Sequence, residues 1–185
     1  MRLFHGTNID FKEIDFQKCK PNKDFGKGFY LTDIKQQALD MAVRRTKFSS
    51  CGSPIVQEYE FDESLLSSKE LKVKVFEGVS NEWAQFILSN RKARGKRVHN
   101  YDIVVGPVAD DSVVYQINIF MLHFITIEEL VKRLEYKKLN SQYFFGTEKA
   151  ISKLKRIWHK RKNKLISLST VMLKKLYLFY KRIMA

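Results

Sequence analysis

Three short segments of the sequence hold side chains that could bind or act on a ligand. They are His5-Gly6-Thr7, the glycine-rich stretch Phe25-Gly26-Lys27-Gly28-Phe29-Tyr30, and Gln142-Tyr143-Phe144-Phe145. Each has an ordinary explanation when it is taken alone. A single histidine at the end of a strand is most often a surface or capping residue, and a Gly-x-Gly-aromatic stretch most often forms a turn that packs on the core. Gln142 alone indicates nothing.

The glycine-rich stretch matches neither of two common phosphate-binding patterns. Gly26-x-Gly28 lacks the third glycine of the Rossmann fingerprint, and it lacks the Gly-Lys-Ser/Thr ending of a P-loop. Metal binding is not indicated either. The two cysteines, Cys19 and Cys51, form no Cys-x-x-Cys pair, and four histidines give no zinc-ligand spacing. We therefore predict no metal site, and nothing in the sequence requires a disulfide.

The three segments fall at the ends of predicted strands. Residues 2–5 form a short strand that runs into a turn, and residues 25–32 place an aromatic strand directly after two glycines. Residues 33–46 carry apolar side chains at helical spacing, with Asp33 or Thr32 as the expected capping residue. Residues 142–146 form a last aromatic strand, after which Thr147 is expected to begin the C-terminal helix.

The rest of the chain mixes strands and helices without a regular β-α-β order. We predict strands over 55–61, 71–76 and 101–108, the last interrupted by Gly106-Pro107. Helices are predicted over 80–90, 112–124 and 126–137. Ser80 is expected to cap the first of these helices, and Thr126 to begin a capping box with Glu129. This order predicts an α+β fold.

Positive charge is concentrated at the C-terminal end. The chain of 185 residues carries a formal net charge of +14. Residues 151–185 hold eleven Lys and Arg and no acid, whereas residues 1–150 hold 23 basic and 20 acidic side chains. This boundary predicts one domain over residues 1–155, with a basic amphipathic helical extension over residues 156–185.

The sequence leaves four interpretations of this extension open. It could pack on the domain with its charges in solvent, lie on an anionic membrane surface, offer positive charge to RNA or DNA, or dock on a partner protein. Its longest apolar stretch, residues 165–173, is about half as long as a bilayer-spanning helix requires, which excludes a transmembrane span. The first residues lack the apolar core of a signal peptide, so we expect a cytoplasmic protein.

Taken together, the three segments resemble the ADP-ribosyltransferase superfamily, in the branch shared by poly(ADP-ribose) polymerases and diphtheria toxin. That branch has His-Gly-Ser/Thr on its first core strand, a Gly-Lys-Gly-aromatic-Tyr segment that leads into a helix, and a glutamate on a late strand. The chain is still more similar to a family of small, uncharacterised bacterial proteins with a Gln-x-x-Phe strand in that late position. The shared motifs are His-Gly-Thr at residues 5–7, Asp-Phe-Gly-x-Gly-Phe-Tyr-x-Thr at 24–32, Tyr-Asp-Ile-Val-x-Gly-Pro-Val-Ala-Asp-Asp at 101–111 and Gln-x-x-Phe at 142–145, so the resemblance covers about residues 1–155.

The resemblance implies mixed sheets with flanking helices, arranged as in ADP-ribosyltransferases, and NAD as a substrate. His5 would hydrogen-bond a ribose hydroxyl of the adenosine half, the backbone of Gly6 would pair with the carboxamide, and Tyr30 would stack on the nicotinamide ring. Gly26 and Gly28 would let the backbone approach the dinucleotide closely. The implied NAD-binding set is His5, Gly6, Thr7, Gly26, Gly28, Phe29, Tyr30 and Met41, and the implied catalytic set is His5, Tyr30 and Gln142.

Two positions depart from the polymerase pattern. Met41 stands where polymerases place a second aromatic, eleven residues after the stacking tyrosine, and its thioether can still cover a ring. Gln142 replaces the glutamate, so it can accept a hydrogen bond but carries no charge. This favours mono-ADP-ribosylation over chain elongation, unless Glu148, Asp110 or Asp111 supplies the acid. For Asp110 and Asp111 the favoured explanation is a helix N-terminus, where acids are stabilising.

The sequence therefore predicts an NAD-dependent mono-ADP-ribosyltransferase that modifies a protein or a nucleic acid. By analogy alone, the resemblance points to a bacterial toxin or defence factor that an antitoxin protein neutralises. The alternative is a catalytically inactive module on the same fold that binds an NAD-like ligand or nucleic acid. Loss of the glutamate favours this alternative, whereas His5, Gly6 and Tyr30 favour the enzyme.

Overall fold

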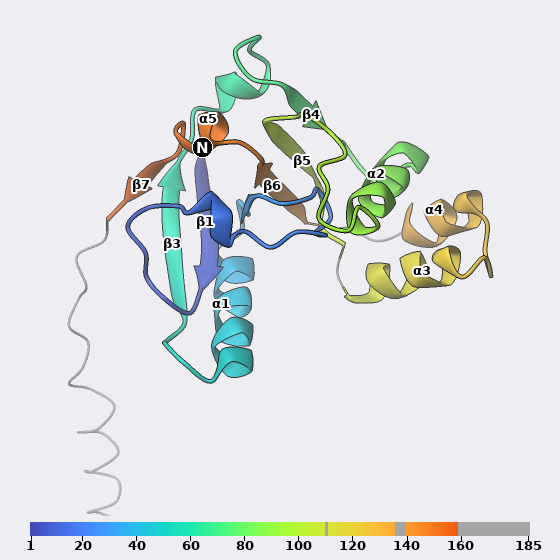
Figure 1. The fold of residues 1–185 in the computed structure, drawn as a ribbon, viewed down its shortest axis with the longest axis horizontal. Coiled ribbons are helices and arrows are strands. Elements are labelled where there is room, and N and C mark those ends of the chain that lie inside the picture. Colours follow the sequence, from blue (N-terminus) through green and yellow to red (C-terminus); the bar gives the residue numbers. More distant parts are fainter. Residues whose placement is uncertain (110, 136–139, 159–185) are drawn as a thin grey trace, which may run out of the picture.

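Apolar residues at alternate positions build two small β-sheets at the centre of the molecule (Figure 1). The computed structural model describes residues 1–109, 111–135 and 140–158. The first sheet has the order β1-β3-β7 and is antiparallel throughout, and the second has the order β2-β6-β5-β4, in which only β4 and β5 are parallel. The strands are β1 (Arg2–Thr7), β2 (Phe29–Leu31), β3 (Ile55–Glu60), β4 (Val73–Val75), β5 (Ile103–Pro107), β6 (Ser141–Phe145) and β7 (Lys155–Ile157).

Within the described residues, a single backbone bridge joins the two sheets. The N–H of Phe4 in β1 donates to the carbonyl of Thr32, just after β2, over 2.7 Å, and the N–H of Thr32 donates to the carbonyl of Phe4 over 3.0 Å. Within the described residues this pairing does not continue along β1. The two strands therefore separate beyond Phe4, and we call His5, Gly6, Phe29 and Tyr30, which flank the separation, the sheet junction.

The helix α1 (Lys35–Ser49) packs on β1 and β3 of the first sheet. Side chains alternate along β1, so Gly6 faces α1, whereas Leu3 belongs to the core between the sheets. A Cβ atom added to Gly6 would lie 2.0 Å from the carbonyl oxygen of Ala38 in α1. Only glycine at this position allows α1 to pack so closely on β1.

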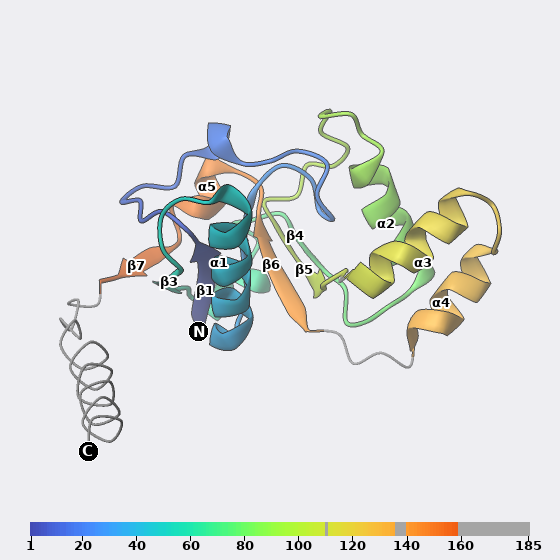
Figure 2. The ribbon, with the colours of Figure 1, turned by 90° about the horizontal axis from the view of Figure 1, so that it is seen from below.

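The second sheet buries both of its faces. One face packs against the first sheet, and this core contains Leu3, Phe29, Leu31, Tyr59, Phe61, Ile103, Val105, Tyr143 and Phe145. The other face packs against three helices, which lie together at one end of the molecule (Figure 2). These helices are α2 (Asn81–Arg91), α3 (Asp111–Met121) and α4 (Ile127–Glu135). The remaining elements of the described residues are the 3-10 helices η1 (Phe16–Lys18) and η2 (Glu63–Leu66) and the short helix α5 (Glu148–Ile151).

The predicted α+β fold is confirmed, and so are two of the predicted helix caps. The hydroxyl of Ser80 accepts the N–H of Trp83 at 3.1 Å, which caps α2. Thr126 and Glu129 form the capping box of α4, with bonds of 2.9 and 3.2 Å between backbone N–H groups and side-chain oxygens. None of the helices in the described ranges is long and apolar enough to span a bilayer.

Two local predictions are wrong. Neither Asp33 nor Thr32 caps α1, because the helix begins at Lys35 after the N-cap residue Ile34, which makes no side-chain capping bond. The hydroxyl of Thr32 accepts the N–H of Ile34 itself at 3.1 Å. The strand β5 is not interrupted at Gly106-Pro107, since these residues pair with Gln142 and Ser141 of β6. Proline is tolerated here because it is the last residue of its strand.

The prediction of a C-terminal helix that begins at Thr147 is also wrong within the described residues. Thr147 caps α5, but α5 ends at Ile151, and β7 then adds an antiparallel strand to β3. β7 crosses the boundary predicted between residues 155 and 156, and Arg156 forms an ion pair with Asp10 over 2.5 Å. Residues 159–185, which make up most of the predicted helical extension, lie outside the described residues.

Candidate functional site

His5 occupies the sheet junction with a defined tautomer. Its Nδ1 atom lies 2.8 Å from the carbonyl oxygen of Tyr30, and its ring packs on Phe29 with centroids 4.4 Å apart. A carbonyl oxygen only accepts hydrogen bonds, so Nδ1 carries the proton. Burial, with a smaller contribution from the positive charge of Arg45, lowers the pKa of His5 to about 4. The imidazole is therefore neutral at pH 7, and Nε2 presents a lone pair that can accept a hydrogen bond from a hydroxyl.

Gly6 presents its backbone to the same place. Successive backbone groups of a strand point to opposite sides, and those of Phe4 point toward β2, where they bond Thr32. The N–H and C=O of Gly6, two residues further along β1, therefore also point toward the β2 side. No backbone hydrogen bond between Gly6 and β2 occurs in the described residues. Gly6 thus offers one donor and one acceptor side by side, which complements a carboxamide group.

Thr7, by contrast, is used locally. The residue is buried, and its hydroxyl donates to the carbonyl of Ile9 at 3.1 Å. This bond shapes the turn that follows β1. The structure therefore gives Thr7 a local structural contact at the position where the resemblance implied NAD binding.

Tyr30 closes the glycine-rich loop with its own side chain. Its hydroxyl donates to the carbonyl of Gly26 at 2.8 Å and accepts the N–H of Phe25 at 3.0 Å. The ring packs on Phe144 with centroids 5.2 Å apart. Burial raises the pKa of Tyr30, so the side chain remains a neutral phenol at physiological pH. Tyr30 is therefore held rigidly, with its carbonyl on His5 and its ring toward the three-helix side of the second sheet.

The two glycines of the loop have structural roles. Gly26 has a φ of +90°, which favours glycine, and an added Cβ would lie 2.9 Å from Oδ1 of Asn90. An added Cβ on Gly28 would lie only 2.2 Å from the ring of Phe144. The close approach at Gly28 is thus to the protein itself, which is the packing explanation that a Gly-x-Gly-aromatic stretch ordinarily has.

Gln142 belongs to a buried polar cluster that the sequence did not reveal. Its Nε2 atom donates to Oδ2 of Asp24 at 2.9 Å and to the carbonyl of Pro107 at 3.2 Å. Arg91 donates to Oδ1 of Asp24 from Nε at 3.0 Å and from Nη2 at 2.5 Å, and the N–H of Ala109 reaches Oδ2 at 3.3 Å. Asp24 and Gln142 are both 8% exposed, so this cluster replaces water with protein partners.

The cluster fixes the orientation of the Gln142 amide. A carboxylate and a carbonyl oxygen can only accept, so the NH₂ group must face Asp24 and Pro107. The carbonyl oxygen Oε1 is then the atom with which the amide accepts a hydrogen bond from a further donor. A glutamate at this position would have no N–H to offer and would place a second negative charge against Asp24. The amide at position 142 is therefore dictated by Asp24.

The structure separates the predicted site residues into two groups. Tyr30 and Gln142 share the face of the second sheet that packs on the helices, whereas His5 and Phe29 lie on the face toward the first sheet. No hydrogen bond or ring contact in the described residues joins His5 to Gln142. Tyr30 connects the groups, because its carbonyl bonds His5 and its ring packs on Phe144, two residues after Gln142.

The remaining candidates lie elsewhere or outside the described structure. Met41 is on α1 and is 46% exposed, and Glu148 is exposed in the first turn of α5. Asp111 begins α3, as the helix N-terminus explanation predicted, but its side chain lies outside the described residues, as does Asp110 altogether. Among the described residues, no group of three His, Cys, Asp or Glu side chains could hold a metal ion.

His99 is a second, half-buried histidine that no sequence motif singles out. Its Nε2 atom lies 2.9 Å from the carbonyl of Phe25, and its Nδ1 accepts the N–H of Tyr101 at 3.3 Å. These partners require a neutral ring with the proton on Nε2, and burial lowers the pKa of His99 accordingly. His99 therefore supports the glycine-rich loop from the side of α2 and β5.

Fold and site together define an α+β protein with a candidate binding site at a junction of two sheets. Residues 1–156 match a protein family described as "Protein of unknown function (DUF3990)", and the chain therefore belongs to this family. No curated protein and no solved structure matches the chain.

The Asp24 cluster predicts the effect of restoring an acid at position 142. Gln142→Glu should lower the free energy of unfolding by about 2–4 kcal/mol, because two carboxylates then share a buried site. Urea unfolding followed by circular dichroism would measure this loss. The double variant Asp24→Asn/Gln142→Glu should recover part of it, since the asparagine amide can donate to the new glutamate while its carbonyl oxygen still accepts from Arg91. A single variant as stable as the wild type would contradict the cluster.

The lowered pKa of His5 predicts a pH dependence of stability. The folded protein holds this ring neutral down to about pH 4, whereas the unfolded chain protonates it near the ordinary histidine pKa of 6.5. Stability contributed by neutral His5 is therefore present above pH 6.5 and is lost as the pH falls toward 4. Urea unfolding at pH 7.0 and 4.5 should show a smaller loss in His5→Gln than in the wild type. The exposed control His123→Asn should retain the wild-type loss, and an equal loss in His5→Gln would show that His5 titrates normally.

Proposed function

We propose that the protein is an NAD-dependent mono-ADP-ribosyltransferase with its NAD site at the sheet junction. The observation that carries this proposal is the juxtaposition of two groups on β1. Nε2 of neutral His5 is an acceptor for a hydroxyl, and the backbone of Gly6 offers a donor and an acceptor toward β2. NAD carries the matching groups, namely ribose hydroxyls and a nicotinamide carboxamide. The ADP-ribosyltransferase-like arrangement of the two sheets is part of the proposal.

In the proposed reaction the bond between nicotinamide and its ribose breaks, and a nucleophile of the acceptor forms a new bond to the same ribose carbon. Nicotinamide leaves with the bonding electron pair, and positive charge develops on the ribose. His5 would bind a hydroxyl of the adenosine ribose, and Gly6 would hold the carboxamide, so that the bond to be broken is fixed in place. Neither group donates or removes a proton in this step.

Met41 would contribute to nicotinamide binding from α1, whereas Tyr30 would act through its carbonyl, which orients His5. The ring of Tyr30 packs on Phe144, on the face of the second sheet opposite to His5, so the stacking that the resemblance implies is not part of the proposal. Met41 lies on α1 between Ala38, whose carbonyl contacts Gly6, and the fully buried Ala42. Its exposed thioether can cover a ring that Gly6 holds.

Gln142 would act as a neutral acceptor, and this supports transfer of single ADP-ribose units. Its amide oxygen can accept a hydrogen bond but cannot take a proton, and the nearby carboxylate of Asp24 is already bound to Arg91. Chain elongation requires activation of a ribose hydroxyl as the next nucleophile, for which these residues provide no free base. A toxin or defence role with a neutralising partner remains an analogy beyond this proposal.

The same lack of charge favours a second candidate function. A protein that binds NAD or a related ligand through His5 and Gly6 without catalysing transfer would have no need of an acid at position 142. Binding would then depend on the sheet junction alone. The two candidates differ in whether label from NAD becomes covalently attached to another molecule.

The enzyme proposal predicts covalent transfer that depends on His5. Incubation of the full chain with adenine-labelled NAD and a bacterial lysate should label a macromolecule, and intact-mass analysis should show single ADP-ribose additions. His5→Ala should reduce the initial rate at least tenfold, because the dinucleotide loses an anchor, whereas His123→Asn should not change it. Wild-type binding of NAD without any labelling would support the second candidate, and long chains of added units would contradict the role given to Gln142.

A further inference from the structure

Two loops that are distant in the sequence form one surface beside the Asp24 cluster. They are residues 18–27 and residues 91–97, which we call the two-loop basic surface. The N–H of Gly95 donates to Oδ1 of Asn22 at 2.8 Å, and the ion pair of Arg91 with Asp24 joins the same loops at their base. Figures 1 and 2 both show the two loops running side by side. Contacts over such a long sequence separation fix one loop relative to the other.

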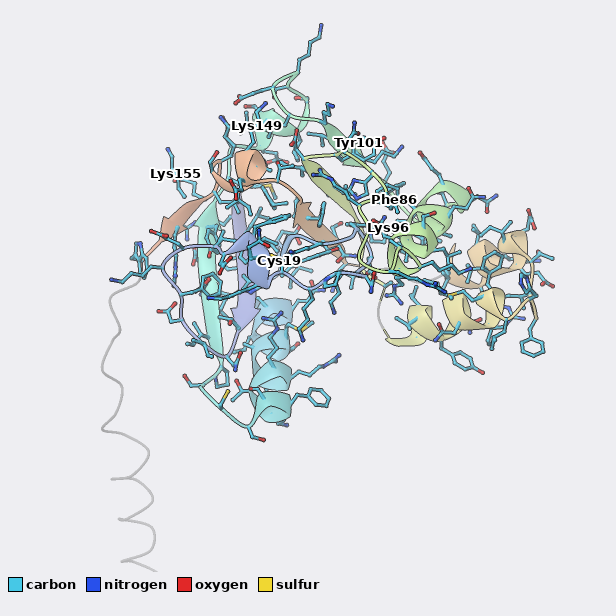
Figure 3. All side chains as sticks on the ribbon, in the orientation of Figure 1. Cys19, Phe86, Lys96, Tyr101, Lys149 and Lys155 are labelled. Atoms are coloured by element: carbon cyan, nitrogen blue, oxygen red, sulfur yellow. The ribbon has the colours of Figure 1, made fainter. Side chains whose placement is uncertain are left out.

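This surface holds most of the excess positive charge of the main part of the chain. Residues 18–27 and 91–97 contain nine Lys and Arg and one acid, whereas the rest of residues 1–150 contains fourteen basic and nineteen acidic side chains. The single acid, Asp24, is buried and bound to Arg91. The exposed cations on the surface are Lys18, Lys20, Lys23, Lys92, Arg94, Lys96 and Arg97, of which Lys18 is paired with Asp15 and Lys96 is labelled in Figure 3.

The charge of Arg97 is positioned before any partner binds, and so is the backbone of Arg94. Arg97 donates from Nε to the carbonyl of His99 at 2.8 Å and from Nη2 to the carbonyl of Tyr101 at 3.3 Å. Arg94 is held in a left-handed turn with a φ of 48°. A partner therefore meets two arginines whose backbone is already ordered, and the side chain of Arg97 is ordered as well. This order lowers the entropic cost of binding.

We propose that the two-loop basic surface binds the phosphate backbone of nucleic acid. Dense positive charge that releases counterions on binding phosphates is the main source of affinity in such complexes. Lysine is depleted in protein–protein interfaces, which rely on apolar anchors, so four exposed lysines beyond the paired Lys18 favour a polyanion over a protein partner. This binding goes beyond the proposed transfer reaction and does not require NAD.

The composition of the surface favours nucleic acid over a membrane. Binding to an anionic bilayer requires apolar side chains that insert below the lipid headgroups. Neither described loop carries a large exposed hydrophobic residue, and Val98 directly after the second loop is the nearest in sequence. Electrostatic attraction without insertion is sufficient for phosphates of a nucleic acid strand but gives only weak contact with lipid.

A matched pair of triple variants tests this proposal in the full chain. Lys92→Gln, Arg94→Asn and Lys96→Gln remove three charges from the surface, with asparagine chosen because it tolerates the left-handed backbone. Lys12→Gln, Lys47→Gln and Lys69→Gln remove three exposed charges elsewhere, so that both variants have the same net charge. Binding of a fluorescein-labelled single strand of twelve thymidines is measured by anisotropy at several NaCl concentrations, without NAD.

The surface variant should bind about tenfold more weakly at 0.1 M NaCl, and the slope of log affinity against log salt should become shallower by about 2 units. The control variant should keep the wild-type slope. Equal losses in both variants, or no loss in the surface variant, would overturn the proposal. Binding of the same variants to vesicles of phosphatidylserine and phosphatidylcholine is measured as well. A surface variant that loses vesicle binding but keeps oligonucleotide binding would assign the surface to lipid instead.

Discussion

Among the described residues, the two hydrogen bonds between Phe4 and Thr32 hold β1 against the end of β2 at one point only, and the candidate site depends on this restriction. Had the pairing continued, the backbone of Gly6 would bond the next residue of β2. Because it stops, the N–H and C=O of Gly6 face the place where the sheets part. His5 partly replaces the missing bonds, since its Nδ1 proton goes to the carbonyl of Tyr30.

The same constraint explains why glycine follows histidine here. α1 packs so closely on β1 that any side chain at position 6 would meet the carbonyl of Ala38. Glycine is therefore required by the fold, and its backbone N–H and C=O point toward the β2 side without a hydrogen bond to that strand. Gly6 therefore meets a packing requirement of the fold and also supplies the backbone groups of the candidate site.

Tyr30 connects the junction to the second polar feature of the molecule. Its carbonyl orients His5, and its hydroxyl closes the loop that follows Asp24. Asp24 in turn binds Arg91 at the end of α2 and Gln142 on β6, so one buried carboxylate ties the loop, the helix layer and the second sheet together. Removing one partner from such a cluster leaves the others unsatisfied.

Local patterns are sufficient to predict most elements and the strands that carry His5, Gly6 and Tyr30, whereas the NAD-binding roles of these residues rest on the resemblance and stay predictions. His5, Gly6 and Tyr30 stand in short motifs at strand ends, where spacing and residue type carry information. The Asp24 cluster could not be predicted, because Asp24 lies 67 residues from Arg91 and 118 from Gln142, and paired polar groups leave no periodic signal. The basic and apolar composition of Lys155–Ile157 favours a helix, but pairing with β3 decides its conformation.

The central claim is that NAD binds at the sheet junction through His5, and NMR of the histidine rings tests it most directly. The imidazole signals of the full chain are followed during titration with NAD, with His5 assigned from the signal that is lost in His5→Gln. The account predicts that the His5 signal shifts in proportion to NAD bound, with Nε2 changing more than Nδ1, because Nδ1 already bonds Tyr30. NAD binding that leaves the His5 signal unmoved, or a titration with no binding at all, would contradict it.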